Sequence, residues 1–225
     1  MSTYILSPHF DDAAVNCYSV LNNTGVSVVT VFGASPQDHT VTLWDMICGI
    51  PSSRKMMIQR IAENKQALTG FKVQLIDLDF LDNQYRKINI SKNDIASKLD
   101  SLIPKDSTIF APLALGQLYS HPDHKLVREA ALMLKNRRLI FYPDVPYMKL
   151  STDNNKTAAK IVKLARDSLN IKLKPVINHL TQEDVASKIN LIKNYDTQYT
   201  MTNLMSFGGL TRIKKLNYEL FFNPG

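Results

Sequence analysis

The chain has 225 residues, of which 44% are hydrophobic and 21% are charged. These proportions are ordinary for a soluble globular protein and exclude a disordered or fibrous chain. The length suits one α/β domain with a sizeable core, so we expect a single domain over residues 1–225. No stretch approaches the roughly 18 uninterrupted apolar residues of a membrane helix, and residues 1–12 do not resemble a signal peptide. We therefore expect a cytoplasmic protein.

The formal net charge of +7 raises the question of a nucleic-acid partner. The lysines are spread along the chain, with mild clusters over 156–174 and 212–215, and no aromatic residues interleave them as stacking platforms. Solvated faces are therefore favoured over a specific nucleic-acid site, although a weak attraction to anionic substrates or membrane surfaces stays open. Cys17 and Cys48 cannot form a disulfide framework, and we expect both to be reduced.

The predicted elements alternate between strands and helices along most of the chain. Strands are expected over residues 3–6, 26–32, 73–76, 107–111 and 139–142, with an extended stretch near 171–177. Helices are expected over residues 14–21, 54–68, 95–102, 121–134, 157–169 and 182–195. This alternation predicts an α/β, Rossmann-like fold with a mainly parallel sheet and helices on both faces.

The connection over residues 34–53 is long, and Pro36, Gly49 and Pro51 predict that it is irregular. A connection of this length in a compact domain is usually a lid or a binding loop. It carries His39, Trp44 and Asp45, any of which could face a substrate, although surface packing is the commoner role of such residues.

Two short motifs occupy predicted strand-to-helix junctions: His9-Phe10-Asp11-Asp12 and His121-Pro122-Asp123-His124. Each places a potential metal ligand three residues after a histidine. Taken alone, either motif is better explained as a helix N-cap beside a hydrogen-bonded histidine than as a metal ligand. Open α/β sheets bind their ligands beyond the carboxyl ends of the strands. Because both motifs follow a predicted strand in this way, their joint presence favours one shared metal site.

His9, Asp12 and His124 supply the three protein ligands that a catalytic zinc site needs, with one position left open for water. Zinc is therefore the expected ion, although another divalent metal is possible. Water bound to such a metal becomes a usable nucleophile near neutral pH, and a neighbouring carboxylate can accept its proton. Asp11 is the candidate base.

His121 lies one turn before His124 and could stabilise an oxyanion if it is protonated, with Asp123 holding its ring. Polar residues also follow the third predicted strand, among them Asp82, Tyr85 and Arg86, at the same edge of the sheet. Any one of these residues could equally cap or solvate a turn.

These motifs resemble those of the PIG-L/LmbE-like family of zinc-dependent N-deacetylases. The first family motif reads His-Pro-Asp-Asp-Glu, and residues 9–13 match it except at Phe10 and Ala13; residues 121–124 match the second motif, His-Pro-Asp-His, at all four positions. Phe10 in place of proline is expected to alter only the stiffness of the loop. Ala13 replaces a glutamate that is not a ligand in the family, so the metal set is kept while a nearby polar contact is lost.

The resemblance covers most of residues 3–147 and extends to further site residues. Arg60 and Glu63 match the helix pattern that follows the long loop in the family, and Arg60 is an expected substrate-binding residue. Asp82 resembles an aspartate that contacts substrate in relatives. Tyr119 stands two residues before His121, like a tyrosine that assists catalysis in some members.

The resemblance implies an N-deacetylase that hydrolyses the acetamide of an N-acetylglucosamine-type sugar or sugar conjugate. The expected partner is thus a small-molecule N-acetylated sugar conjugate, and oligomerisation stays open. The alternative is an inert relative that keeps the fold as a glycan-binding module, against which the complete ligand set argues. The residues after Met148 are the least informative, although 195–200 and 217–222 could close over the site.

Overall fold

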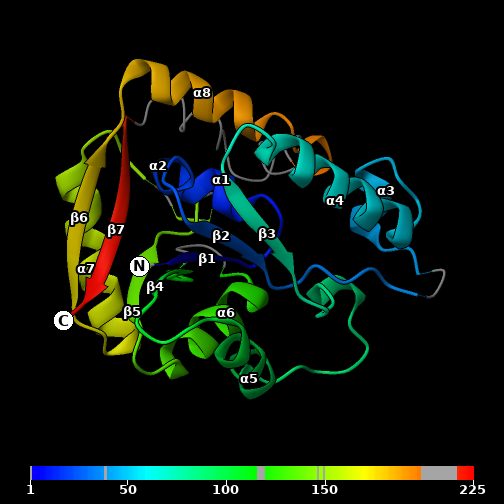
Figure 1. Cartoon of the computed structure of the whole chain (residues 1–225), viewed down its shortest axis with the longest axis horizontal. Helices are drawn as coiled ribbons and strands as arrows, with labels where there is room; N and C mark the ends of the chain where they lie inside the picture. The colour runs from blue at the N-terminus through cyan, green and yellow to red at the C-terminus, as the bar shows by residue number, and fades with distance from the viewer. Residues whose placement is uncertain (1, 38–39, 116–119, 146, 149, 199–216) are drawn as a thin grey trace.

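The computed structural model describes residues 2–37, 40–115, 120–145, 147–148, 150–198 and 217–225. A seven-stranded sheet forms the centre of the molecule, in the order β3-β2-β1-β4-β5-β7-β6 (Figure 1). The strands are β1 (Thr3–Ser7), β2 (Val26–Thr30), β3 (Val73–Asp77), β4 (Thr108–Pro112), β5 (Arg138–Tyr142), β6 (Leu173–His179) and β7 (Tyr218–Pro224). Strands β1 to β5 are parallel to one another, whereas β7 runs antiparallel to both β5 and β6. The predicted α/β fold with a mainly parallel sheet is confirmed.

Helices cover both faces of the sheet, and each face has its own apolar core. The helices are α1 (Asp12–Asn16), α2 (Tyr18–Leu21), α3 (Leu43–Ile47), α4 (Ser53–Leu68), α5 (Lys92–Leu102), α6 (Pro122–Met133), α7 (Asn154–Leu169) and α8 (Gln182–Ile192), with a 3-10 turn η1 (Asn83–Tyr85). Leu99 of α5, Val127 of α6 and Ile161 of α7 belong to one core. Met57 of α4 and Leu191 of α8 belong to the other, beside α1 and α2. Figure 1 shows these two groups of helices on opposite sides of the strands.

The inner strands are apolar because both of their faces are covered. All five residues of β2 are buried, and β2 pairs in parallel register with β1, from Thr3 opposite Val26 to Ser7 opposite Thr30. A strand that is covered on both faces needs apolar, β-branched residues at successive positions rather than alternating ones. Val26, Val28 and Val29 meet this requirement, while Ser27 and Thr30 are buried polar residues.

The C-terminal strand was not foreseen. Residues 217–222 were expected as a segment that could close over the site, and this prediction is wrong because β7 lies inside the sheet between β5 and β6. Its Glu219 accepts hydrogen bonds from the backbone N–H groups of Tyr18 and Ser19 and forms a 2.6 Å ion pair with Lys188. The carboxylate therefore ties the N-terminus of α2 to α8.

The long connection before α4 is anchored from inside by Asp45, which is completely buried. Its Oδ1 accepts a 2.6 Å hydrogen bond from Tyr85 Oη, and its Oδ2 accepts one of 2.5 Å from Ser53 Oγ. Asp45 also forms a capping box with Thr42 at the start of α3. Asp45 thus holds the loop together and does not face a substrate; His39 lies outside the described residues.

Among the helices that the structure describes, none combines the length and the apolar character needed to cross a membrane.

Candidate metal centre and active site

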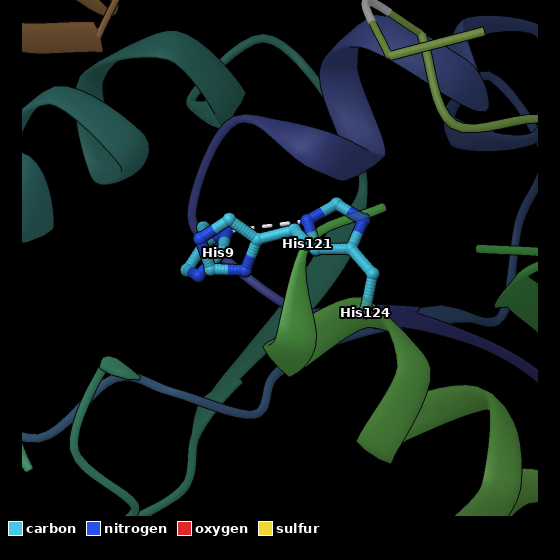
Figure 2. A group of neighbouring side chains, drawn as sticks. All are labelled: His9, His121 and His124. Carbon is cyan, nitrogen blue, oxygen red and sulfur yellow. Dashed lines mark hydrogen bonds between the residues drawn. The ribbon is translucent and has the colours of Figure 1, made fainter. Parts of the chain in front are cut away.

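Both histidine motifs lie at the carboxyl ends of adjacent parallel strands. β1 pairs with β4, so the segment after β1 and the segment after β4 leave the sheet at the same edge. His9 precedes α1, and Asp12 is the first residue of that helix. His121 is the N-cap of α6, and Pro122 follows it in the first turn, where a missing N–H costs little. The fold therefore brings His9, His121 and His124 together, as Figure 2 shows.

Three donor atoms form a compact triangle. His124 Nε2 lies 3.3 Å from His9 Nδ1 and 3.3 Å from Asp12 Oδ2, and the latter two atoms lie 3.6 Å apart. A tetrahedral zinc ion with ligands at about 2.0–2.1 Å requires donor atoms about 3.3–3.4 Å from one another. The three side chains thus fit one such ion, both in their chemistry and in their spacing.

Each of the two imidazoles also has a carboxylate at its other ring nitrogen. His9 Nε2 lies 3.2 Å from Asp123 Oδ2, and His124 Nδ1 lies 3.2 Å from Asp144 Oδ1. Such carboxylates fix the tautomer and the orientation of metal-binding histidines, so that the opposite nitrogen presents its lone pair to the ion. Asp123 and Asp144 are 0% and 1% exposed, so water does not compete for these contacts.

The electrostatics of the triangle favour a cation. Burial alone would lower the pKa of His9, but the contacts with Asp12 and Asp123 raise it well above its usual value. Burial likewise opposes the charged form of His124, yet Asp12 and Asp144 raise its pKa. Burial alone would raise the pKa of Asp12, whereas His124 and His9 lower it. The carboxylates therefore favour positive charge within the triangle, which a divalent ion can supply in place of protons.

His121 has a different environment. The backbone N–H of Asp123 donates a 3.2 Å hydrogen bond to His121 Nδ1, so that this nitrogen acts as the cap of α6. Burial, together with the charges of His9 and His124, lowers the pKa of His121 to about 3. A neutral ring with an acceptor at Nδ1 carries its proton on Nε2. The expectation of a protonated His121 is therefore not supported by this environment.

Asp123 was expected to hold the ring of His121, but it lies closer to other groups. Its Oδ2 is 3.9 Å from His121 Nδ1, against 3.2 Å from His9 Nε2. Its Oδ1 pairs with Arg86 at 2.6 Å, and its Oδ2 accepts a 3.0 Å hydrogen bond from the backbone N–H of Asn83. Asp123 thus orients His9 and joins the metal triangle to the segment after β3.

Asp11 lies beside the triangle and contacts a residue from far along the chain. Gln198 Nε2 donates a 2.6 Å hydrogen bond to Asp11 Oδ1. Burial, and then the negative charge of Asp12, raise the pKa of Asp11 to about 6. Thr197 in turn donates from Oγ1 to Glu63 on α4 at 2.6 Å. The expectation that residues 195–200 reach the site is met at Gln198, whereas 199 and 200 lie outside the described residues.

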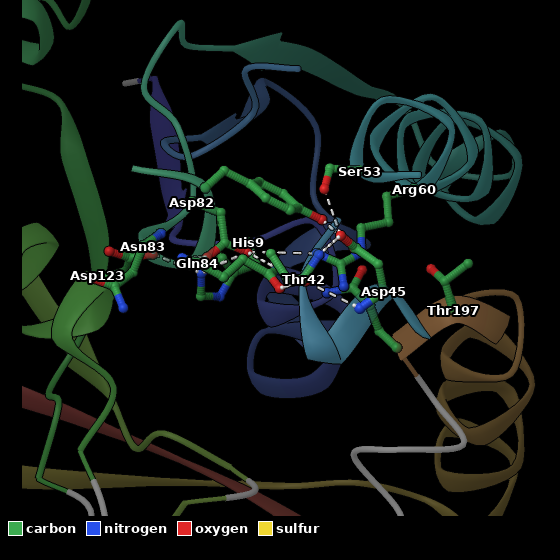
Figure 3. Close-up of polar contacts among 12 residues, drawn as sticks. His9, Thr42, Asp45, Ser53, Arg60, Asp82, Asn83, Gln84, Asp123 and Thr197 are labelled. Atoms are coloured by element: carbon green, nitrogen blue, oxygen red, sulfur yellow. Dashed lines mark hydrogen bonds and ion pairs between the residues drawn. The ribbon is translucent and has the colours of Figure 1, made fainter. Parts of the chain in front are cut away.

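The two expected substrate-binding residues lie together at one side of the site (Figure 3). Arg60 Nη1 is 3.6 Å from Asp82 Oδ2, and the same oxygen is 4.0 Å from His9 Nε2. Asp82 Oδ1 accepts a hydrogen bond from the backbone N–H of Gln84, whose side chain accepts one from Thr42. Arg60 and Asp82 are 4% and 5% exposed, so any substrate group that reaches them is largely removed from water.

Further potential metal ligands surround the triangle. The ligand atoms of His9, His121 and His124 lie within 4.8 Å of one another, as do those of His9, Asp82, His121 and Asp123. The triangle of His9, Asp12 and His124 has the shorter spacing, and its ring nitrogens are not engaged as helix caps. We therefore take it as the candidate metal site.

Tyr119 lies outside the described residues. Phe10 was expected to affect only loop stiffness, but it is 1% exposed and packs in the core beside α1. Ala13 is completely buried, and its backbone N–H donates to Ser7 Oγ at 3.0 Å, which fixes the turn after β1.

The sequence alone did not identify Asp144 and Gln198 as residues of the site. Asp144 follows β5 at the same sheet edge as the histidine motifs, and this placement could have singled it out. Gln198 stands in a segment without a recognised motif, and only the fold brings it to Asp11.

Comparison with known proteins identifies a family and a shared fold. The family model described as PIG-L, GlcNAc-PI de-N-acetylase, matches residues 4–135. A zinc-inhibited form of a teicoplanin deacetylase has 21% identity and a TM-score of 0.72, over 100% of this chain and 97% of that chain. A deacetylase of the A40926 pseudoaglycone has 21% identity and a TM-score of 0.73, with the same coverage. An N,N'-diacetylchitobiose deacetylase from Pyrococcus horikoshii has 15% identity and a TM-score of 0.57, over 99% of this chain and 84% of that chain. No curated protein sequence matches the chain.

Proposed function

The chain belongs to the PIG-L family, and from this membership we propose that it is a zinc-dependent N-deacetylase acting on an N-acetylated sugar conjugate. The observation that carries the proposal is the triangle of His9 Nδ1, Asp12 Oδ2 and His124 Nε2, with sides of 3.3 to 3.6 Å. The names of the structural relatives support the substrate class, since they are deacetylases of teicoplanin, of the A40926 pseudoaglycone and of N,N'-diacetylchitobiose. The whole of residues 1–225 is proposed to act as one domain.

A zinc ion held by these three side chains would supply a polarised water molecule and a positive charge beside the acetamide carbonyl. Asp11 would accept a proton from the attacking water and return it to the leaving nitrogen. Its raised pKa, about 6, suits an exchange of protons near neutral pH. Gln198 holds one oxygen of this carboxylate, which leaves the other oxygen for the proton.

His121 can stabilise the charge that develops on the carbonyl oxygen. Because the N–H of Asp123 occupies Nδ1, the proton stays on Nε2 and can be donated to that oxygen by a neutral ring. Arg60 and Asp82 offer a cation and an acceptor for the hydroxyl groups of a sugar beside the acetamide. Tyr119 remains a predicted contributor from the segment before α6.

The test is acetate release from N-acetylglucosamine conjugates by the purified protein, with zinc content measured on the same samples. We expect turnover that a chelator abolishes and that zinc restores. His124→Ala should lose both zinc and activity, whereas His179→Ala, which changes an exposed histidine at the end of β6, should lose neither. Bound zinc without turnover on a broad panel of acetamides would contradict the enzyme and favour a binding module.

A further inference from the structure

Asn16, the last residue of α1, connects two distant segments through a single side chain. Its Nδ2 donates hydrogen bonds to the carbonyl oxygen of Asp12 at 3.0 Å and to that of Val145 at 3.3 Å. Its Oδ1 accepts a 3.0 Å hydrogen bond from the backbone N–H of Val145. Asn16 is 4% exposed, so these contacts are protected from competing water.

The two segments that Asn16 joins carry opposite sides of the metal centre. Asp12 is a proposed metal ligand and begins the helix that Asn16 ends. Val145 follows Asp144, whose carboxylate lies 3.2 Å from Nδ1 of the proposed ligand His124. Asn16 therefore lies between one metal ligand and the residue that orients another.

The position of Asp144 depends on its backbone. Among the residues that the structure describes, His124 is the one ion-pair or hydrogen-bond partner of the Asp144 carboxylate. No other side chain of the described residues aims this carboxylate at the imidazole. The backbone of the turn after β5 must do so, and Asn16 binds both the backbone N–H and the backbone C=O of Val145 in that turn.

We propose that Asn16 is a positioning residue that holds Asp144 against His124 and thereby sets the zinc affinity of the centre. This inference rests on the metal site of the proposed function. The proposal also explains why this residue is an asparagine, because a side-chain amide offers both an acceptor for the N–H and a donor for the C=O of Val145. Aspartate has the same shape but lacks the donor, and alanine lacks both groups.

The experiment measures the affinity of the purified protein for zinc alone, by competition with a chromophoric chelator. Removing a partner of a metal-binding histidine typically weakens metal binding by about 10–100-fold, and we expect about 10-fold for Asn16→Ala and Asn16→Asp. Asn23→Ala is the matched control: Asn23 also donates to the carbonyl four residues before it, at 3.4 Å, but it is exposed. Its zinc affinity should equal that of the wild type.

A double-substitution cycle separates positioning from general destabilisation. Asp144→Asn should weaken zinc binding by a similar factor, and adding Asn16→Ala to it should weaken binding no further, because both changes act through His124. Additive losses, or wild-type affinity in both Asn16 variants, would overturn the proposal. If Asn16→Ala does not fold, Asn16→Asp, which keeps the side-chain shape, completes the same cycle. If the wild-type protein binds zinc but does not deacetylate, only the proposed function is contradicted. The role of Asn16 is tested by zinc affinity and not by activity.

Discussion

Gln198 and Asp11 are joined by a 2.6 Å hydrogen bond that spans 187 residues of sequence. The family model ends at residue 135, so this contact brings a part of the chain beyond the matched region to the first histidine motif. Thr197 and Glu63 anchor the neighbouring backbone on α4. The orientation of the proposed base thus depends on a segment that follows α8.

Replacing Gln198 with alanine should lower kcat by about 10-fold while zinc affinity stays unchanged, because the carboxylate of Asp11 loses its orientation but the metal triangle does not. Steady-state kinetics measures the change in kcat, and zinc titration measures the zinc affinity. Gln182→Ala, at the exposed start of α8, is the control and should behave as the wild type. Loss of zinc binding in Gln198→Ala would show that the contact supports the metal site instead.

Asp11 and Asp12 are adjacent in sequence but should give opposite phenotypes. Asp11→Asn removes the proposed base and should lower kcat by roughly 10²–10⁴-fold with zinc still bound. Asp12→Asn removes a ligand and should weaken zinc binding by more than the roughly 10–100-fold expected for a residue behind the ligands. Metal analysis and single-turnover assays distinguish the two. The same zinc loss in both variants would contradict the separate roles.

The buried pair of Lys188 and Glu219 should matter for stability rather than catalysis. Lys188→Met leaves the Glu219 carboxylate buried without its cation and should cost about 3 kcal/mol of unfolding free energy. The double variant Lys188→Met/Glu219→Gln should recover part of this loss, because no uncompensated charge remains. Urea denaturation measures both quantities. An equal or larger loss in the double variant would mean that the hydrogen bonds from Tyr18 and Ser19, and not the charge, dominate.

Asp45 should make stability depend on pH in the acid range. Burial alone would raise the pKa of this carboxyl, but the hydrogen bonds from Ser53, Tyr85 and Thr42 lower it below its usual value. A lowered pKa in the folded state means that the carboxylate stabilises the fold above the unfolded pKa of about 3.9, and that this contribution is lost as pH falls through the folded pKa.

Asp45→Asn should therefore cost about 2 kcal/mol at pH 7, and the difference from the wild type should shrink as pH falls below 4. Denaturant unfolding at several pH values measures this difference. Asp79→Asn, which changes an exposed aspartate after β3, serves as the control with little effect at any pH. A difference that stays constant down to the acid limit would contradict the assigned cause.

Sequence periodicity predicted β1 to β5 and most helices, because covered strands and amphipathic helices leave apolar patterns that are local. It did not predict β7, since residues 218–222 resemble any short apolar run and their partners in β5 and β6 are distant. The histidine motifs pointed to the metal triangle because their spacing reflects strand-to-helix turns. Asn16, Asp144 and Gln198 carry no such spacing, and their roles depend on contacts between segments that only the folded chain brings together.

The place of β7 also constrains the order in which the molecule can assemble. In the described sheet, β6 bonds to β7 alone, and β7 supplies the link to β5. During synthesis, β6 emerges from the ribosome well before the strand that must separate it from β5. Its backbone groups remain without their final partners until residues 218–224 have followed. A ribosome that stalls just before these residues would leave a sheet whose edge has unpaired backbone N–H and C=O groups, and such an edge can pair with another chain. Rapid synthesis of residues 218–224 should therefore protect this protein from aggregation.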